Sequence, residues 1–147
     1  MYLNKGPVRP GVVSRLIAKA CEKPNTGGHS LFLGRVRADI INGKSVKAIE
    51  YFTYDEMVTV GADKIKAAVH WEFSDIKSVD ILHSKGIVKA GEVSLVVLIS
   101  AGHRHHAMQA CAKTVEMIKE RLPVWGKELF EDGTYHWRHN DQPSEQD

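Results

Sequence analysis

Apolar residues recur along the chain at two periods, which predict three helices separated by strands. Helical spacing runs from Pro10 to just before Pro24, from Asp55 to Val69, and through the segment that ends at Leu122. We expect Asp55 to cap the second helix and Pro123 to end the third. The positions that carry this spacing are Val12, Val13, Leu16, Ile17 and Ala20; Met57, Val60, Ile65, Ala68 and Val69; Met108, Cys111, Val115, Ile118 and Leu122.

Alternating or continuous apolar runs predict the strands. Segment 27–37 is expected to be a buried strand, and 46–54 a return strand after a hairpin turn at Asn42-Gly43. Further strands are predicted at 77–84 and 93–100, with turns at Lys85-Gly86 and Ala90-Gly91. Segment 124–140 mixes aromatic and turn residues and predicts an edge strand or hairpin. The pattern indicates one α+β domain over 1–140 with an antiparallel sheet, followed by a polar, flexible tail at 141–147.

Composition narrows the class of protein. The 147 residues are 43% hydrophobic, enough for one domain with a core, and no apolar run resembles a membrane span or a signal peptide. We therefore expect a soluble, cytoplasmic protein. A net charge of +2 argues against binding to nucleic acid or membrane surfaces. Cys21 and Cys111 are far apart, which argues against a disulfide scaffold or a thiolate zinc site.

A cluster of cations stands where the third helix is expected to begin. The segment "SAGHRHHAMQA", residues 100–110, contains Arg104 together with His103, His105 and His106. A helix N-terminus already carries partial positive charge, so cations there are unfavourable unless an anion joins them. The cluster therefore predicts a bound anion.

Other candidate motifs have ordinary alternatives. The segment "ADIINGKS" (38–45) loosely fits a phosphate-binding loop, but its glycine falls in the predicted hairpin. The histidines, including His136 and His139, lack the ligand spacing of zinc motifs, so we expect no metal and no cofactor. Arg35 and Arg37 share one strand face, either as a solvated strand end or as half of an anion clamp. The cluster of Lys113, Lys119, Lys127, Glu116, Glu120 and Glu128 is equally consistent with a solvated helix face.

Several short motifs occur together in a specific order. They are "FLGRVR" (32–37), "YDEM" (54–57), "HSKGIVKAGE" (83–92), "SAGHR" (100–104), Lys119 and "PVWGKE" (123–128). From about Gly28 to Trp137, the chain resembles the large, catalytic subunit of molybdopterin synthase. The resemblance implies an α/β-hammerhead type of fold and a heterotetramer, in which a central homodimer carries a ubiquitin-like small subunit at each end.

The resemblance also implies a reaction and its residues. A thiocarboxylate on the C-terminal Gly-Gly of the small subunit supplies two sulfurs to cyclic pyranopterin monophosphate, which forms the dithiolene of molybdopterin. Substrate binding falls on Arg35, Val36, Arg37, His103 and Arg104, and the catalytic lysine falls on Lys119. In a partly desolvated cationic pocket, the pKa of Lys119 is expected to be lowered, which suits proton transfer.

One position departs from the family pattern. A second family lysine would fall on Gly126, while Lys127 and Glu128 match the two residues that follow it. We predict that Gly126 lets Lys127 turn inward as a second catalytic residue, that all three residues border the substrate, and that Gly126→Lys is tolerated. The alternative is a non-catalytic module that binds a pterin or phosphate on the same fold.

Helix geometry places one further constraint on the site. Arg104 and Lys119 are fifteen residues apart on one predicted helix, hence separated by roughly 22 Å along its axis. One small substrate cannot contact both within a single chain. We therefore predict that Arg104 of one subunit meets Lys119 of the other across the central dimer.

Overall fold

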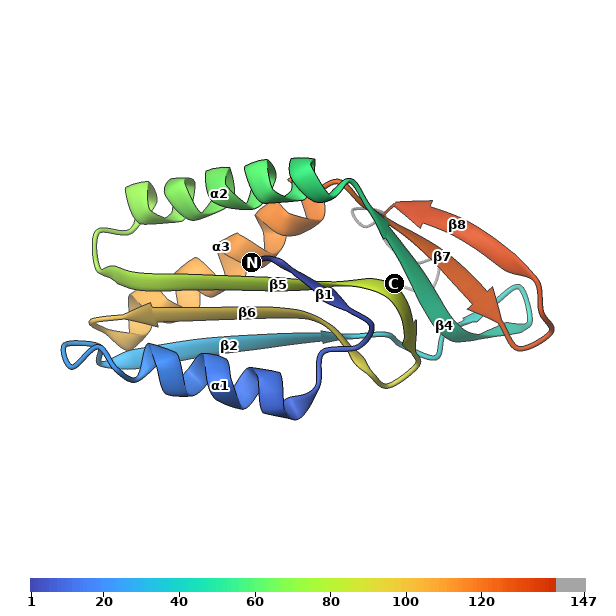
Figure 1. The fold of residues 1–147 in the computed structure, drawn as a ribbon, viewed down its shortest axis with the longest axis horizontal. Helices are drawn as coiled ribbons and strands as arrows, with labels where there is room; N and C mark the ends of the chain where they lie inside the picture. The colour runs from blue at the N-terminus through green and yellow to red at the C-terminus, as the bar shows by residue number, and fades with distance from the viewer. Residues whose placement is uncertain (140–147) are drawn as a thin grey trace.

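The computed structural model describes residues 1–139 and has an α+β architecture (Figure 1). Its helices are α1 (Pro10–Ala20), α2 (Asp55–Glu72) and α3 (Arg104–Arg121). Its strands are β1 (Leu3–Lys5), β2 (Gly28–Arg35), β3 (Ile40–Ile41), β4 (Lys44–Thr53), β5 (Ile76–Lys89), β6 (Val93–Ala101), β7 (Val124–Phe130) and β8 (Tyr135–His139). The three predicted helices are confirmed. The predicted tail, 141–147, lies outside the described residues.

The strands form one sheet in the order β2-β6-β5-β4-β7-β8, and β1 and β3 pair with β5 and β4. All pairs are antiparallel except β1 with β5. The first part of β5, residues 76–83, pairs with β6, whereas residues 86–89 pair with β4. This division separates a body, formed by β1, β2, β6 and the three helices, from an arm formed by β3, β4, β7 and β8 (Figure 1).

Strand β5 bends where the sequence predicted a turn. Gly86 has φ of 93°, a left-handed conformation that glycine adopts without steric cost, but β5 continues through it to Lys89. The prediction that Lys85-Gly86 ends a strand is therefore wrong. The turns at Asn42-Gly43, with φ of 52° and 76°, and at Ala90-Gly91 are confirmed.

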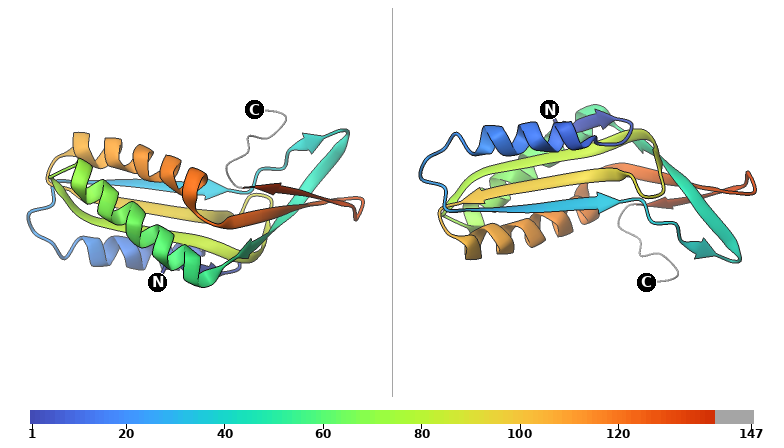
Figure 2. Two further views of the ribbon diagram at one scale, coloured as in Figure 1. Left: turned by 90° about the horizontal axis from the view of Figure 1, so that it is seen from above. Right: turned by 90° about the horizontal axis from the view of Figure 1, so that it is seen from below.

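Helices cover both faces of the body. Figure 2 shows α1 on the opposite side of the sheet from α3, and α2 packs beside α3. Strand β6 serves both layers, because Val96 packs in the cluster under α1 whereas Val97 and Ile99 join the main core under α2 and α3. Burial on both faces accounts for the nearly continuous apolar sequence of β6.

Other predicted core positions are exposed. Leu31 and Leu33 are 40% and 42% exposed because β2 is an edge strand whose burial alternates, so the prediction of a buried strand is wrong. Met57, Val60 and Met108 are likewise exposed, on α2 and α3.

Asp55 is the first residue of α2, and Tyr54 occupies the N-cap position. The predicted Asp55 cap is therefore wrong, because its carboxylate accepts hydrogen bonds from Thr53 Oγ1 and Lys85 Nζ, both at 2.6 Å. In residues 1–139, no helix has the length and apolar character needed to cross a membrane.

Candidate active site

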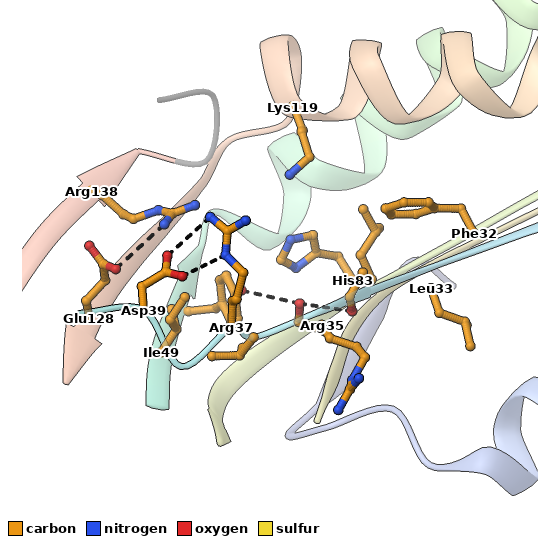
Figure 3. A pocket seen from close by; sticks show the side chains of 15 residues that line it. Phe32, Leu33, Arg35, Arg37, Asp39, Ile49, His83, Lys119, Glu128 and Arg138 are labelled. Atoms are coloured by element: carbon orange, nitrogen blue, oxygen red, sulfur yellow. Dashed lines mark hydrogen bonds and ion pairs between the residues drawn. The ribbon is translucent and has the colours of Figure 1, made fainter. Parts of the chain in front are cut away.

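A cavity of about 300 Å³ opens at the junction of body and arm (Figure 3). Strands β2, β4, β5, β6, β7 and β8 and the last turn of α3 all contribute to its lining. Its charged lining residues are Arg35, Arg37, Asp39, Lys119, Glu128 and Arg138. Four cations against two carboxylates give the lining a surplus of positive charge, which favours an anionic ligand.

The two arginines after β2 point in different directions. The register of β2 shifts between Gly34 and Arg35, and the strand ends there. Arg35 Nε donates to the carbonyl oxygen of Gly91 at 2.9 Å, whereas Arg37 Nε and Nη2 donate to the carboxylate of Asp39 at 2.7 and 3.3 Å. In Figure 3 the guanidinium of Arg37 faces Lys119, and that of Arg35 points away. The prediction that both share one strand face is wrong, because β2 ends at Arg35 and its alternation does not extend to Arg37.

Lys119 extends from the last turn of α3 toward the cavity, which His83 also lines (Figure 3). Lys119 is exposed in the single chain. His83 is buried, and its Nδ1–H donates to the carbonyl oxygen of Ser84 at 2.7 Å. Burial, together with the nearby charge of Lys119, lowers the pKa of His83 to about 4. The lining therefore contains a neutral imidazole beside an ammonium.

Strand β7 separates its residues between two faces. Glu128 is buried on the cavity side, where its carboxylate lies 3.2 Å from His136 Nδ1 and 3.6 Å from Arg138 Nη1. Lys127 must face the other way because side chains alternate along a strand. Its Nζ lies over the rings of Tyr135 and Trp137, 4.1 and 5.6 Å from their centroids. The predicted inward turn of Lys127 is therefore wrong.

Two histidines at the start of α3 have a carboxylate partner within the chain. Asp75 Oδ2 lies 3.0 Å from His103 Nδ1 and 3.2 Å from His106 Nδ1. The hydrogen bond from His103 is the largest cause of a lowered pKa at Asp75. The structure itself places the Asp75 carboxylate at this helix start, and the bound anion that the sequence predicts there stays a prediction. His103 and Arg104 do not line the cavity, which lies at the other end of α3.

The structure bears on two other sites considered from the sequence, a phosphate-binding loop and a metal site. Segment 38–45 contains the hairpin of β3 and β4, and so lacks the strand-to-helix context of a phosphate-binding loop. Over residues 1–139, no three histidine, cysteine or acidic side chains gather into a possible metal site.

Among the cavity residues that the sequence did not predict are four titratable ones: Asp39, Tyr51, His83 and Arg138. His83 lies within the motif at 83–92, but nothing local to the sequence showed that it is buried. Arg138 had one indirect signal, since it pairs across the sheet with Gly126, where a side chain is missing.

The fold and the cationic cavity define an α+β protein suited to a small anionic ligand. Comparison with known proteins identifies the family. The MoaE protein family matches residues 7–121. The chain belongs to this family, the catalytic subunits of molybdopterin synthase.

Curated relatives carry the name molybdopterin synthase catalytic subunit. The relative from Dictyostelium discoideum is 36% identical over 124 residues, covering 83% of this chain and 78% of its own. The relative from Aspergillus fumigatus is 37% identical over 117 residues, covering 80% of this chain and 61% of its own. The chain spans only 33% of the length of the relative from Drosophila grimshawi.

Solved structures share the fold. Molybdopterin synthase from Staphylococcus aureus superposes with a TM-score of 0.81 at 22% identity, covering 93% of this chain and 95% of that one. A complex of subunits 1 and 2 of molybdopterin-converting factor from Helicobacter pylori gives a TM-score of 0.78 at 18% identity, covering 92% and 88%. The expected α+β fold is confirmed.

Proposed function

We propose that this chain acts as a sulfurtransferase that converts cyclic pyranopterin monophosphate into molybdopterin. The observation that carries the proposal is the meeting of Arg37, from the end of β2, with Lys119, from the last turn of α3, in one cationic cavity (Figure 3). These two residues stand 82 positions apart in sequence, yet both match the family motifs. The proposed setting is the cytoplasm, where free thiols such as Cys21 and Cys111 are the usual state.

Different cavity residues bind the substrate and transfer the proton. Arg37, held by Asp39, binds the phosphate, and the backbone around Arg35 and Val36 forms the wall beside it. Lys119 donates a proton to the oxygen that leaves as sulfur bonds to the substrate carbon. Glu128, fixed by His136 below the cavity, orients the arm that closes this side of the site.

The sulfur comes from a partner. We propose that a ubiquitin-like small subunit inserts its C-terminal Gly-Gly thiocarboxylate into the cavity, and that the full assembly is a heterotetramer around a homodimer of this chain. The structural neighbour from Helicobacter pylori is a complex of subunits 1 and 2 of molybdopterin-converting factor.

The homodimer would complete the site. Arg104 and Lys119 lie in the same helix, α3, about 22 Å apart along its axis. We propose that His103 and Arg104 of a second subunit reach the cavity of the first, with two α3 helices antiparallel about a two-fold axis. In that arrangement Asp75 holds the donated segment in place through His103.

A second candidate function is binding without chemistry. It is favoured by one observation: Gly126 lacks the family lysine, and Lys127 faces away from the cavity. Lys119 is then the lysine of the lining, and a single lysine is enough to bind an anion.

Reconstituted turnover separates the two candidates. The purified chain is mixed with thiocarboxylated small subunit and the cyclic precursor, and molybdopterin is measured. Product formation supports the sulfurtransferase. Tight binding of the precursor without product supports the binding module. Weaker precursor binding by Arg37→Ala, and competition by inorganic phosphate, would support the anion site in either case.

A further inference from the structure

Gly126 and Arg138 face each other across the ladder of β7 and β8. A Cβ atom placed on Gly126 would lie 3.7 Å from Cγ of Arg138 and 3.1 Å from Cγ2 of Ile49. The aliphatic stem of Arg138 thus runs beside the α-carbon of Gly126. Because Gly126 shares the cavity face of β7 with Glu128, this stem leads the guanidinium into the cavity.

The guanidinium of Arg138 is held more loosely than that of Arg37. Arg37 makes two hydrogen bonds to Asp39, at 2.7 and 3.3 Å. Within the described residues, the ion-pair partner of Arg138 is Glu128 at 3.6 Å, beyond hydrogen-bond distance. The Arg138 side chain is 23% exposed, and it lines the same cavity as Arg37. A guanidinium has five N–H donors, so Arg138 keeps donors to offer a ligand.

We propose that Arg138 is a substrate-binding residue of the cavity, which donates hydrogen bonds to the phosphate, and that Gly126 is the gap through which it reaches. This inference rests on the proposed function for its ligand, a cyclic phosphate ester. In this inference, Arg138 on the edge strand β8 supplies a positive charge. In the family pattern, a lysine at position 126 of the neighbouring strand β7 supplies it.

An arginine replaces the charge of a lysine but not all of its chemistry. A guanidinium grips phosphate oxygens with two parallel N–H groups, yet it stays protonated at all working pH values. Arg138 therefore binds and orients the substrate, while proton transfer remains with Lys119. Removal of Arg138 is expected to weaken substrate binding more than it slows the bound complex.

The first experiment measures binding of the cyclic precursor, and of inorganic phosphate as its competitor, by calorimetry. Arg138→Ala is expected to weaken precursor binding roughly 10- to 100-fold, the effect of losing a charged hydrogen bond. Arg138→Lys should recover part of that loss. Lys44→Ala is the matched control, because Lys44 is a cation of the same arm that pairs with Asp132 outside the cavity. It should bind the precursor as the wild type does.

The second experiment places a cation at position 126 of β7, with and without Arg138 on β8. Gly126→Lys alone should bind poorly, because the new side chain meets both Ile49 and the stem of Arg138. This outcome differs from the sequence-based expectation that the substitution is tolerated. In the double variant G126K/R138A the stem is gone, so precursor affinity should rise at least several-fold above that of either single variant. Gly126→Ala measures the cost of the Ile49 contact by itself.

The outcomes separate the two proposals. If wild type binds no precursor, the proposed function fails. If wild type binds it and Arg138→Ala binds equally well, the inference about Arg138 is overturned. A purely structural role for Arg138 predicts a lower melting temperature with unchanged precursor affinity, and this result would also overturn it. Should Arg138→Ala fail to fold, Arg138→Lys and the double variant decide by the same affinities.

Discussion

The two ends of helix α3 both carry basic residues, but they differ in the acidic groups around them. At the N-terminal end, His103 and His106 share the carboxylate of Asp75. At the C-terminal end, Lys119 faces a cavity whose lining has more cations than carboxylates. The helix dipole disfavours cations at the first end and favours them at the second. A built-in anion is therefore needed at the start of α3, whereas Lys119 is already stabilised and can serve a ligand.

Within one chain, the cationic cluster at the start of α3 lies apart from the cavity, so a role for it in substrate binding depends on a second subunit. Segment 100–110 is the more conspicuous of the two in sequence, and two of its three histidines, His103 and His106, contact Asp75. The cavity is assembled from single cations on separate elements: Arg37 after β2, Lys119 on α3 and Arg138 on β8. The predictions below test whether the two ends do different work.

The largest effect is expected at Lys119. Lys119→Ala should lower turnover by ~10²- to 10⁴-fold, the usual contribution of a positioned proton donor. Its melting temperature should hardly change, because the residue is exposed. Lys113→Ala, at an exposed position of the same helix outside the cavity lining, is the control and should keep wild-type turnover. Near-normal single-turnover rates in Lys119→Ala would remove its catalytic role.

The buried imidazole of His83 predicts a pH dependence of stability. The pKa of His83 is about 4 in the folded protein, against about 6.5 in an unfolded chain. Between these values the unfolded chain binds a proton that the folded chain does not. The free energy of unfolding should therefore fall as pH drops from 6.5 to 4, by about 3 kcal/mol over the whole interval.

Urea unfolding at a series of pH values checks this dependence. His83→Gln, which cannot titrate, should have a flatter profile over the same range, whatever its stability at neutral pH. Parallel profiles for wild type and variant would show that His83 is not the titrating group.

At the other end of α3, Asp75→Asn should lower the melting temperature. The variant loses the carboxylate that the two histidines and the helix start share. Its effect on turnover should be smaller than that of Lys119→Ala, because Asp75 positions His103 and does not reach the cavity. Circular dichroism melts and turnover assays measure the two effects. A loss of turnover equal to that of Lys119→Ala, with an unchanged melt, would contradict this division.

The smallest effect is expected at Lys127, which stacks over Tyr135 and Trp137 on the outer face of the arm. Lys127→Ala should cost about 0.5–1 kcal/mol of stability, as expected for an exposed cation–π contact. Single-turnover sulfur transfer should be unchanged. A large loss of transfer would restore the sequence-based prediction that Lys127 turns inward.

The features that could be predicted from the sequence are those set by residues close together along the chain. The spacing of Cys111, Val115 and Ile118, with Pro123 beyond, defined α3, and the Asn42-Gly43 pair defined a hairpin whose left-handed φ values the structure has. Lys119 and Arg37 were identified through the family resemblance, and the structure brings both to one cavity.

The errors arise where tertiary contacts decide. Gly86 was predicted to lie in a turn, but pairing of β5 with β1 and β4 keeps it inside the strand. Arg35 and Arg37 were predicted to share one strand face, but β2 ends at Arg35, so Arg37 lies outside the strand. His83 and Arg138 enter the site through strand pairings between distant segments, which no local pattern records.

The most direct test of the central claim, that the two ends of α3 form one site only across a dimer, uses a mixed dimer. Subunits with Arg104→Ala and with Lys119→Ala are co-expressed with different tags, and the heterodimer is isolated. One cavity then carries both substitutions and the other carries neither, so turnover should return to about half of wild type while each parent homodimer is nearly inactive. A mixed dimer as inactive as its parents would show that Arg104 and Lys119 do not meet across the two-fold axis.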